Sequence, residues 1–200
     1  MTSRNPDLFE MRRLESLSNT IFGVAMTLLA YDLPKAGSFA NAPDWADLYH
    51  LYAGRLAALV LSFIIAGLFW FSHHRRLARQ PEASRGIVIL NLVFLLSIIL
   101  LPVTNGLYGN YRLSSAVAVL YGMHLAIIAG LNALLWWFCR KHSWYEIAGA
   151  IFPVLVFVPG TVIAAFFPQY VQYFWGLAFF SLLVSRIVAP GGGQGAAKKD

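Results

Sequence analysis

The sequence carries little charge for its length. Only 12% of its 200 residues are Asp, Glu, Lys or Arg, whereas 58% are hydrophobic. Soluble domains contain about 25% charged residues and about 45–50% apolar residues. The scarcity of charge excludes an ordinary soluble domain and indicates a polytopic membrane protein.

Cysteine and catalytic motifs are also scarce. The single cysteine, Cys139, excludes an internal disulfide bond. The five histidines form no HExxH spacing, and the sequence has no GxSxG elbow, no Walker A loop and no GxGxxG fingerprint. We therefore expect no enzyme activity, no cofactor and no structural metal site.

Long apolar segments take up most of the chain. Six of them are long enough to cross about 30 Å of hydrocarbon as helices. We place them at residues 12–33, 50–73, 86–107, 112–138, 144–167 and 170–188. The predicted fold is an all-α membrane domain of six transmembrane helices over residues 1–189. Residues 190–200, rich in Gly, Ala and Lys, resemble a flexible tail or an artificial remnant.

The basic residues predict the orientation in the membrane. With six spans, 12 of the 15 Lys and Arg residues fall on one side, and Lys35, Arg55 and Arg112 fall on the other. Basic loops favour the cytoplasmic side, so both termini are expected there. The net charge of +6 is then a property of cytoplasmic loops and does not predict nucleic-acid binding.

The first apolar segment carries a stripe of hydroxyl groups. On a helix that advances about 100° per residue, the stripe lies within about 40° of Thr20. It comprises Arg13, Ser16, Thr20, Val24, Thr27 and Tyr31. Such a face is typical of a helix that lines a water-filled pathway through the membrane. The alternative is that the hydroxyls bond back to their own helix and assist helix packing.

Polar residues gather at the cytoplasmic ends of the first two spans. Arg13 and Asn19 lie near the start of the first span, and His73 lies at the end of the second. Their shared depth predicts a polar network that ties the two helices together. The alternative is that Arg13 and His73 are separate interfacial residues whose side chains snorkel to the membrane surface.

Several motifs together resemble one known family. The first span has Arg13, then Leu17-Ser18-Asn19, then an apolar run over Ile21–Asp32. Trp70 and His73 form a Trp-x-x-His motif, and further similar segments lie at residues 91–104 and 118–122. These features resemble the transmembrane protein 175 family of potassium channels, in particular its short bacterial members. Leu17 and Asn19 stand where the family usually has Phe and Asp.

The resemblance implies a homotetramer in a bacterial cell membrane, with potassium as the permeant ion. The first span would line the pore, and the sequence has no TVGYG-like stretch for a carbonyl filter. The resemblance places an apolar constriction at Val24, Leu28 and Tyr31, and pore-lining or ion-coordinating hydroxyls at Ser16, Thr20 and Thr27. It assigns a structural network to Arg13, Ser18, Asn19, Trp70 and His73.

Two other functions remain compatible with the sequence. A small secondary transporter, with or without coupling to protons, could use His73, His124 and Asn91 as an internal site. A membrane scaffold without transport activity is the third class. Single-channel steps in liposomes would distinguish a channel from both.

The predicted topology can be tested by cysteine labelling. In a Cys139→Ser background, single cysteines in residues 35–49 should react with an impermeant thiol reagent added outside intact cells. Cysteines in residues 75–85 should react only after the cells are opened. The reverse labelling pattern would refute the predicted orientation.

Overall fold

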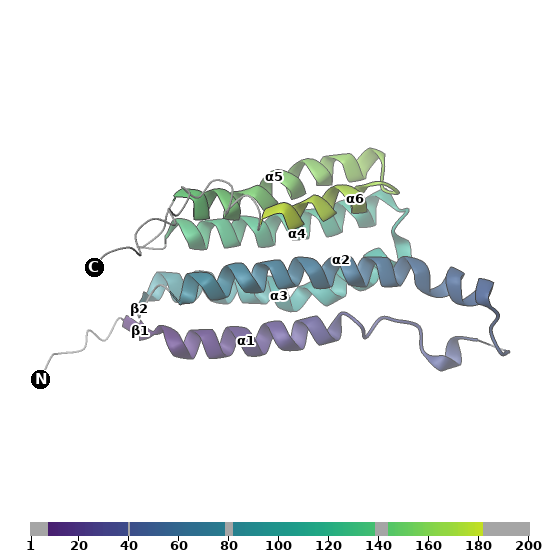
Figure 1. Ribbon diagram of the computed structural model, residues 1–200, viewed down its shortest axis with the longest axis horizontal. Helices are drawn as coiled ribbons and strands as arrows, with labels where there is room; N and C mark the ends of the chain where they lie inside the picture. The colour runs from purple at the N-terminus through teal and green to yellow at the C-terminus, as the bar shows by residue number, and fades with distance from the viewer. Residues whose placement is uncertain (1–7, 40, 79–81, 139–143, 182–200) are drawn as a thin grey trace, which may run out of the picture.

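The computed structural model describes residues 8–39, 41–78, 82–138 and 144–181. Long helices lie side by side along its long axis, with α1 at one edge, α2 and α3 in the middle, and α4 to α6 beyond them (Figure 1). The helices are α1 (Met11–Leu28), α2 (Trp45–Leu77), α3 (Arg85–Tyr111), α4 (Ser115–Trp137), α5 (Trp144–Phe166) and α6 (Val171–Gly176), with 3₁₀ helices η1 (Ala36–Ser38) and η2 (Leu177–Phe180).

Four helices of the described chain are long and apolar enough to cross a membrane, namely α2, α3, α4 and α5. Helix α1 is not one of them, because its first turns contain Arg12, Arg13, Glu15 and Asn19. Of the expected sixth span, residues 171–180 form α6 and η2, and the part after residue 181 lies outside the described residues. The proposed tail at 190–200 also lies outside them.

Several boundaries of helices α1 to α5 differ from those expected, and the end of α1 and the start of α2 differ most, by five residues each. Helix α1 ends at Leu28, five residues before the predicted end, and its backbone continues in three-residue turns such as Tyr31 N–H to Leu28 C=O at 3.0 Å. Helix α2 begins at Trp45, five residues before the predicted start. Asp44 and Asp47 explain that early start: they form a capping box, each accepting the other's backbone N–H, at 3.1 and 2.8 Å.

Two short strands depart from the purely helical expectation. Strands β1 (Leu8–Glu10) and β2 (Glu82–Ser84) pair in antiparallel register, with Leu8 opposite Ser84. Each directly precedes a helix, so the pairing brings the start of α1 next to the start of α3. The extended backbone before each helix leaves N–H and C=O groups free to pair, which a helical pattern in the sequence does not reveal.

A run of phenylalanine rings forms the centre of the core. Phe22 of α1 lies 6.0 Å from Phe94 of α3, which lies 6.5 Å from Phe69 of α2. Phe69 in turn lies 6.3 Å from Phe157 of α5. All four rings are buried and tilted or edge-on to one another, the arrangement that aromatic quadrupoles favour. The run joins four helices and sets their spacing.

Buried polar side chains also join helices. The Ser62 hydroxyl of α2 donates to Asn105 Oδ1 of α3 at 2.7 Å and lies 2.6 Å from the Tyr121 hydroxyl of α4. In a medium without water these groups have few other partners, so the cluster fixes the register of three helices.

Two glycines allow Trp175 to enter the packing between α4 and α5. The Trp175 ring is fully buried, and a Cβ placed on Gly160 would lie 2.6 Å from its Nε1 atom. A Cβ on Gly122 would lie 2.8 Å from the same ring. Both positions therefore require the absence of a side chain.

We expect Gly160→Ala to lower the free energy of unfolding by about 1–3 kcal/mol, because the added methyl must displace a ring held on all sides. Gly130→Ala is the matched control, since a Cβ at Gly130 meets no atom within 4 Å. The control should be neutral or stabilising by up to about 1 kcal/mol, the helix-propensity gain of alanine. Apparent melting temperatures in detergent measure both, and equal values would contradict the packing argument.

Candidate functional site

Helix α1 has one face buried within its own chain. Leu14, Ser18, Phe22, Ala25 and Leu29 are buried there against α2 and α3, at the three- and four-residue spacing of a helix stripe. Ser18 belongs to this face, and its hydroxyl donates to the Leu14 carbonyl at 2.7 Å. The apolar stripe therefore fixes which residues of α1 point away from the bundle.

The opposite face of α1 is exposed in the single chain. All the predicted pore residues lie on it: Ser16, Thr20, Val24, Thr27, Leu28 and Tyr31 are exposed. The exposed fractions of Val24, Leu28 and Tyr31 are 53%, 44% and 68%. None of the three is buried by α2 or α3, so ordinary packing within this chain does not account for them. Tyr31 lies in the turn after Leu28, just beyond the regular helix.

The hydroxyls on this face bond back to the helix. Thr27 Oγ1 donates to the Val24 carbonyl at 2.7 Å, and Thr20 Oγ1 donates to the Ser16 carbonyl at 3.0 Å. The back-bonding alternative is thus realised in the single chain. A hydroxyl that has donated its proton still presents two lone pairs, which point away from the helix and can accept a hydrogen bond or contact a cation.

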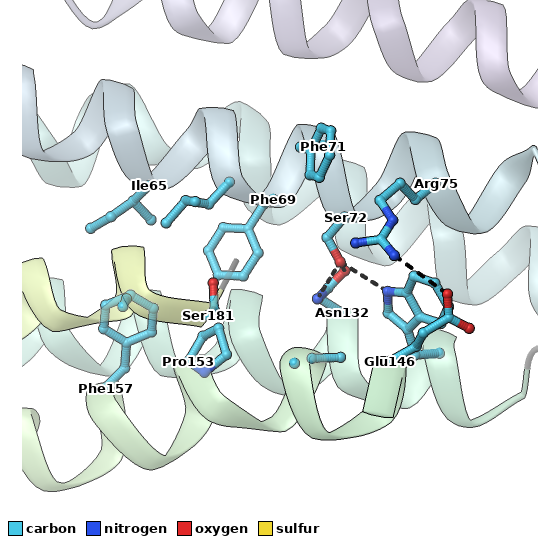
Figure 2. A pocket seen from close by; sticks show the side chains of 15 residues that line it. Ile65, Phe69, Phe71, Ser72, Arg75, Asn132, Glu146, Pro153, Phe157 and Ser181 are labelled. Carbon is cyan, nitrogen blue, oxygen red and sulfur yellow. Dashed lines mark hydrogen bonds and ion pairs between the residues drawn. The ribbon is translucent and has the colours of Figure 1, made fainter. Parts of the chain in front are cut away.

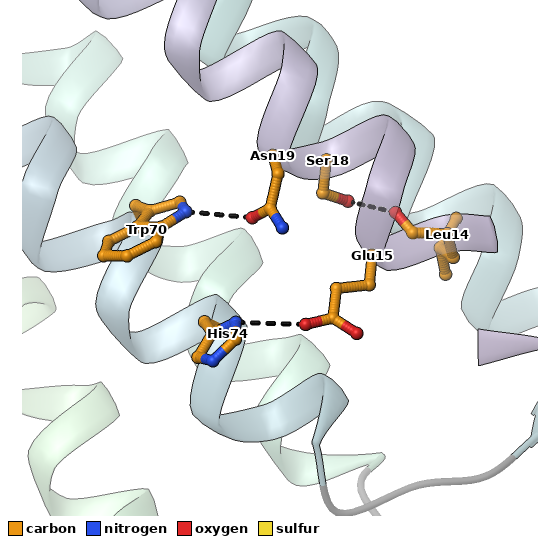
Figure 3. A network of polar contacts seen from close by, with 6 residues as sticks. All are labelled: Leu14, Glu15, Ser18, Asn19, Trp70 and His74. Atoms are coloured by element: carbon orange, nitrogen blue, oxygen red, sulfur yellow. Dashed lines mark hydrogen bonds and ion pairs between the residues drawn. The ribbon is translucent and has the colours of Figure 1, made fainter. Parts of the chain in front are cut away.

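Two side-chain contacts tie the start of α1 to the end of α2 (Figure 3). Trp70 Nε1 donates to Asn19 Oδ1 at 3.0 Å, and His74 Nδ1 lies 3.1 Å from Glu15 Oε1. The Trp70 and His74 rings also stack, with centroids 5.7 Å apart. The predicted contribution of Asn19 and Trp70 to a helix-tethering network thus takes the form of a direct hydrogen bond.

His73 belongs to a separate buried cluster. Its Nε2 lies 2.6 Å from Asn91 Oδ1 of α3, and Arg76 Nη2 donates to the same oxygen at 3.1 Å. Because a carbonyl oxygen only accepts, His73 Nε2 is the donor. His73 therefore does not hydrogen-bond Asn19, contrary to the expected arrangement. It contacts α1 through Phe22, 5.9 Å away, and stacks on Phe94 at 5.4 Å.

Sequence reasoning missed Glu15, His74 and the role of Asn91. The sequence did contain a pattern that could have indicated the contact between Glu15 and His74. Glu15 and Asn19 are four residues apart on α1, as are Trp70 and His74 on α2, so each pair lies on one helix face. If the two helices are neighbours and these pairs lie at the same depth in the membrane, each residue of one pair can contact one residue of the other. The partner of His73 had no comparable signal, because Asn91 lies on a third helix.

The residues of the transporter alternative do not form one hydrogen-bonded site. His73 contacts Asn91, but His124 Nδ1 lies 2.7 Å from the Thr104 hydroxyl and its Nε2 lies 3.0 Å from the Ser97 carbonyl. His124 therefore joins α4 to α3. Within the described ranges, no three His, Cys, Asp or Glu side chains are grouped as a metal site would require.

A small cavity of about 40 Å³ lies between α2, α4, α5 and η2. Figure 2 shows its polar end, where Trp136 Nε1 donates to Ser72 Oγ at 2.8 Å and Arg75 lies 3.5 Å from the Glu146 carboxylate. These polar groups partner one another. The cavity is remote from the exposed face of α1, which remains the stronger candidate for function.

The fold and the two faces of α1 define a multi-pass helical membrane protein. Comparisons with known proteins show what the chain is similar to. The family model described as endosomal/lysosomal potassium channel TMEM175 matches residues 13–102. A potassium channel of Streptomyces collinus is 29% identical over 137 residues, which are 64% of each chain. The human endosomal/lysosomal proton channel TMEM175 is 28% identical over 117 residues, covering 53% of this chain and 21% of that protein.

A solved structure shares the fold. The crystal structure of a lysosomal potassium-selective channel TMEM175 homolog from Chamaesiphon minutus superposes with a TM-score of 0.77 at 19% identity, covering 88% of this chain and 97% of that one. Residues 13–102 of the chain are therefore similar to the TMEM175 family, and the relatives that match are named as ion channels. Its matches to the curated channels of Streptomyces collinus and of Chryseobacterium span 64% and 58% of their lengths.

The neighbouring histidines provide a matched test of the two contacts. His73→Ala should lower the free energy of unfolding by about 2–4 kcal/mol, because it leaves a cavity and removes a buried donor from Asn91. His74→Ala should cost less than about 1 kcal/mol, because the His74–Glu15 pair is exposed to solvent screening. Thermal unfolding of the purified protein measures both. Equal losses would show that the buried cluster does not stabilise this end of the bundle.

Proposed function

We propose that four copies of this chain form a cation channel that prefers potassium to sodium, with α1 of each copy lining the pore. The observation that carries the proposal is the exposed face of α1, on which hydroxyl-bearing and apolar side chains lie together. A face of this kind gains little from contact with lipid, and one helix cannot enclose a path. Several copies arranged around an axis would turn the same face toward water.

The family supports both the activity and the ion. Relatives from Streptomyces collinus and Chryseobacterium are named potassium channels, and the fold matches a potassium-selective homolog. The human relative is named a proton channel, so protons are the competing permeant ion. Within the described residues the chain offers no acidic side chain on α1 between Glu15 and Asp32 that would bind protons in the pore.

The proposed pore has a constriction and a coordinating ring. Val24, Leu28 and Tyr31 would narrow it with four copies of each side chain, and the Val24 ring would resist ions because methyl groups cannot replace hydration. One helix turn further, four Thr27 hydroxyls would present their outward lone pairs to the ion. A ring of neutral oxygens favours the cation that loses its water more readily, which is potassium rather than sodium.

The reversal potential in reconstituted liposomes tests the proposal. Under opposed potassium and sodium gradients, a potassium-preferring channel should reverse near the potassium equilibrium potential and show unitary current steps. In a second measurement, the potassium concentration is equal on both sides of the membrane and a pH gradient is applied. Reversal that follows the proton gradient would favour proton conduction, and slow saturable flux without unitary steps would favour a transporter.

We expect Thr27→Val to reduce the potassium-to-sodium permeability ratio by about fivefold, the worth of roughly 1 kcal/mol of lost coordination. The substitution keeps the side-chain shape and removes only the hydroxyl. Thr161→Val is the matched control, because Thr161 of α5 also bonds back to its helix, to Phe157 at 2.7 Å, and lies away from α1. An unchanged ratio in the Thr27 variant would eliminate the coordinating role.

Val24 is expected to set the width of the constriction. Val24→Asn should wet the ring and raise the resting conductance, whereas Val24→Phe should abolish the current. The same two changes at Val158 of α5 are matched controls, since the exposed fractions of Val24 and Val158 are 53% and 50%. If assembled Val24 variants conduct like the Val158 variants, the constriction lies elsewhere.

A further inference from the structure

A basic hollow lies at the end of the bundle where α3 passes into α4. It has a volume of about 430 Å³, is open to its surroundings, and is lined by residues from the first turns of α2, the end of α3 and the start of α4. The polar lining residues are His50, Arg55, Asn110, Tyr111, Arg112 and Ser114. None of the lining residues is acidic, so two guanidinium groups share the hollow without a carboxylate.

Arg55 is held in place by neutral groups alone. Its Nε and Nη2 both donate to Asn110 Oδ1, at 2.9 and 2.7 Å, and its Nη1 donates to the Leu51 carbonyl. Asn110 is itself fixed by a bond from Nδ2 to the Gly106 carbonyl at 2.8 Å. Asp32 lines a smaller neighbouring hollow together with Arg55, and among the described residues no ion pair joins the two side chains. The charge of Arg55 is therefore positioned without being neutralised.

Arg112 lies across Gly54, so close that a Cβ on that glycine would be 3.1 Å from Arg112 Nε. The Arg112 guanidinium forms no hydrogen bond or ion pair with any residue that the structure describes, and the Ser114 hydroxyl caps no backbone amide of α4. Five guanidinium donors and a hydroxyl are thus available to a ligand. Two like charges in one hollow repel each other, and an anion between them would remove the repulsion.

The surroundings identify the source of the anion. Tyr111 and Leu113, at the rim, are 62% and 67% exposed, and the apolar sides of α3 and α4 continue from this point. Aromatic and apolar side chains beside arginines are typical of the depth where lipid headgroups meet the hydrocarbon. We propose that the hollow binds the phosphate of a membrane phospholipid from the leaflet at this end, through Arg112 and Arg55.

The proposal also predicts which lipid binds best. A phosphodiester pairs with guanidinium groups through two parallel hydrogen bonds, which lysine cannot reproduce. The quaternary amine of a zwitterionic headgroup would bring a third positive charge next to the two arginines. Phosphatidylglycerol should therefore be retained in preference to phosphatidylcholine.

Native mass spectrometry of the purified full chain in mild detergent tests the site, with phosphatidylglycerol or phosphatidylcholine added. The wild type should retain phosphatidylglycerol, and Arg112→Gln should lower the bound fraction at least about tenfold, as expected for the loss of a charge-assisted contact. Arg112→Lys should retain an intermediate fraction. Lys35→Gln is the matched control, because it removes one positive charge from the same end of the chain outside the hollow. Its lipid retention should equal that of the wild type.

Two further measurements decide the remaining outcomes. Thermal unfolding in phosphatidylcholine shows whether the Arg112→Gln variant is folded. If the variant is unfolded, the salt dependence of lipid retention by the wild type replaces it as the test. Retention of phosphatidylglycerol should then fall with added sodium chloride, and retention that is independent of salt overturns the proposal. Equal retention of both lipids, or equal retention by Arg112→Gln and Lys35→Gln, also overturns it. Stabilisation by inorganic phosphate without lipid retention would overturn the lipid source and identify a free anion as the ligand.

Discussion

The packing of Phe22 against His73 and Phe94 fixes the rotation of α1 about its own axis. Each residue advances the helix by about 100°, so the buried position of one ring decides the direction of every other side chain. With Phe22 inward, Val24 and Thr27 must point outward. The exposed polar face therefore depends on an apolar contact on the opposite side of the helix, and a change in that contact would rotate the face as a whole.

The attachment of α1 is uneven along its length. Near its start, Asn19 and Glu15 bond to Trp70 and His74 of α2, and strand β1 pairs with β2. Toward Leu28 the contacts of α1 with the rest of the chain are apolar, and the regular helix is followed by three-residue turns. Hydrogen bonds depend on direction, whereas dispersion contacts do not, so the two polar contacts restrain the orientation of the start of α1. The outer part of α1 is accordingly the freer part, and it carries the residues proposed to narrow the pore.

Much of the fold could be predicted from apolar length and charge, because both are properties of consecutive residues. The positions of α3, α4 and α5 and the outward face of α1 follow from local patterns. The end of α1, the β1–β2 pairing and the His73–Asn91 contact do not, because they depend on which helices become neighbours. A single sequence shows that His73 is polar and deep, but it does not show which of several equally deep amides will face it.

The capping box at Asp44 has a mechanical consequence for the whole bundle. It starts α2 so early that the helix, 33 residues long, extends past the neighbouring helices (Figure 1). At 1.5 Å per residue its length is about 50 Å, roughly 20 Å more than the hydrocarbon thickness. If α2 tilted by about 10° in the membrane, the end of these protruding turns would move sideways by about 3 Å. Residues 29–44 join that tip to the end of α1, and the Tyr52 hydroxyl of α2 donates to the Pro34 carbonyl at 2.9 Å, so a tilt of α2 would move the segment that follows the first helix.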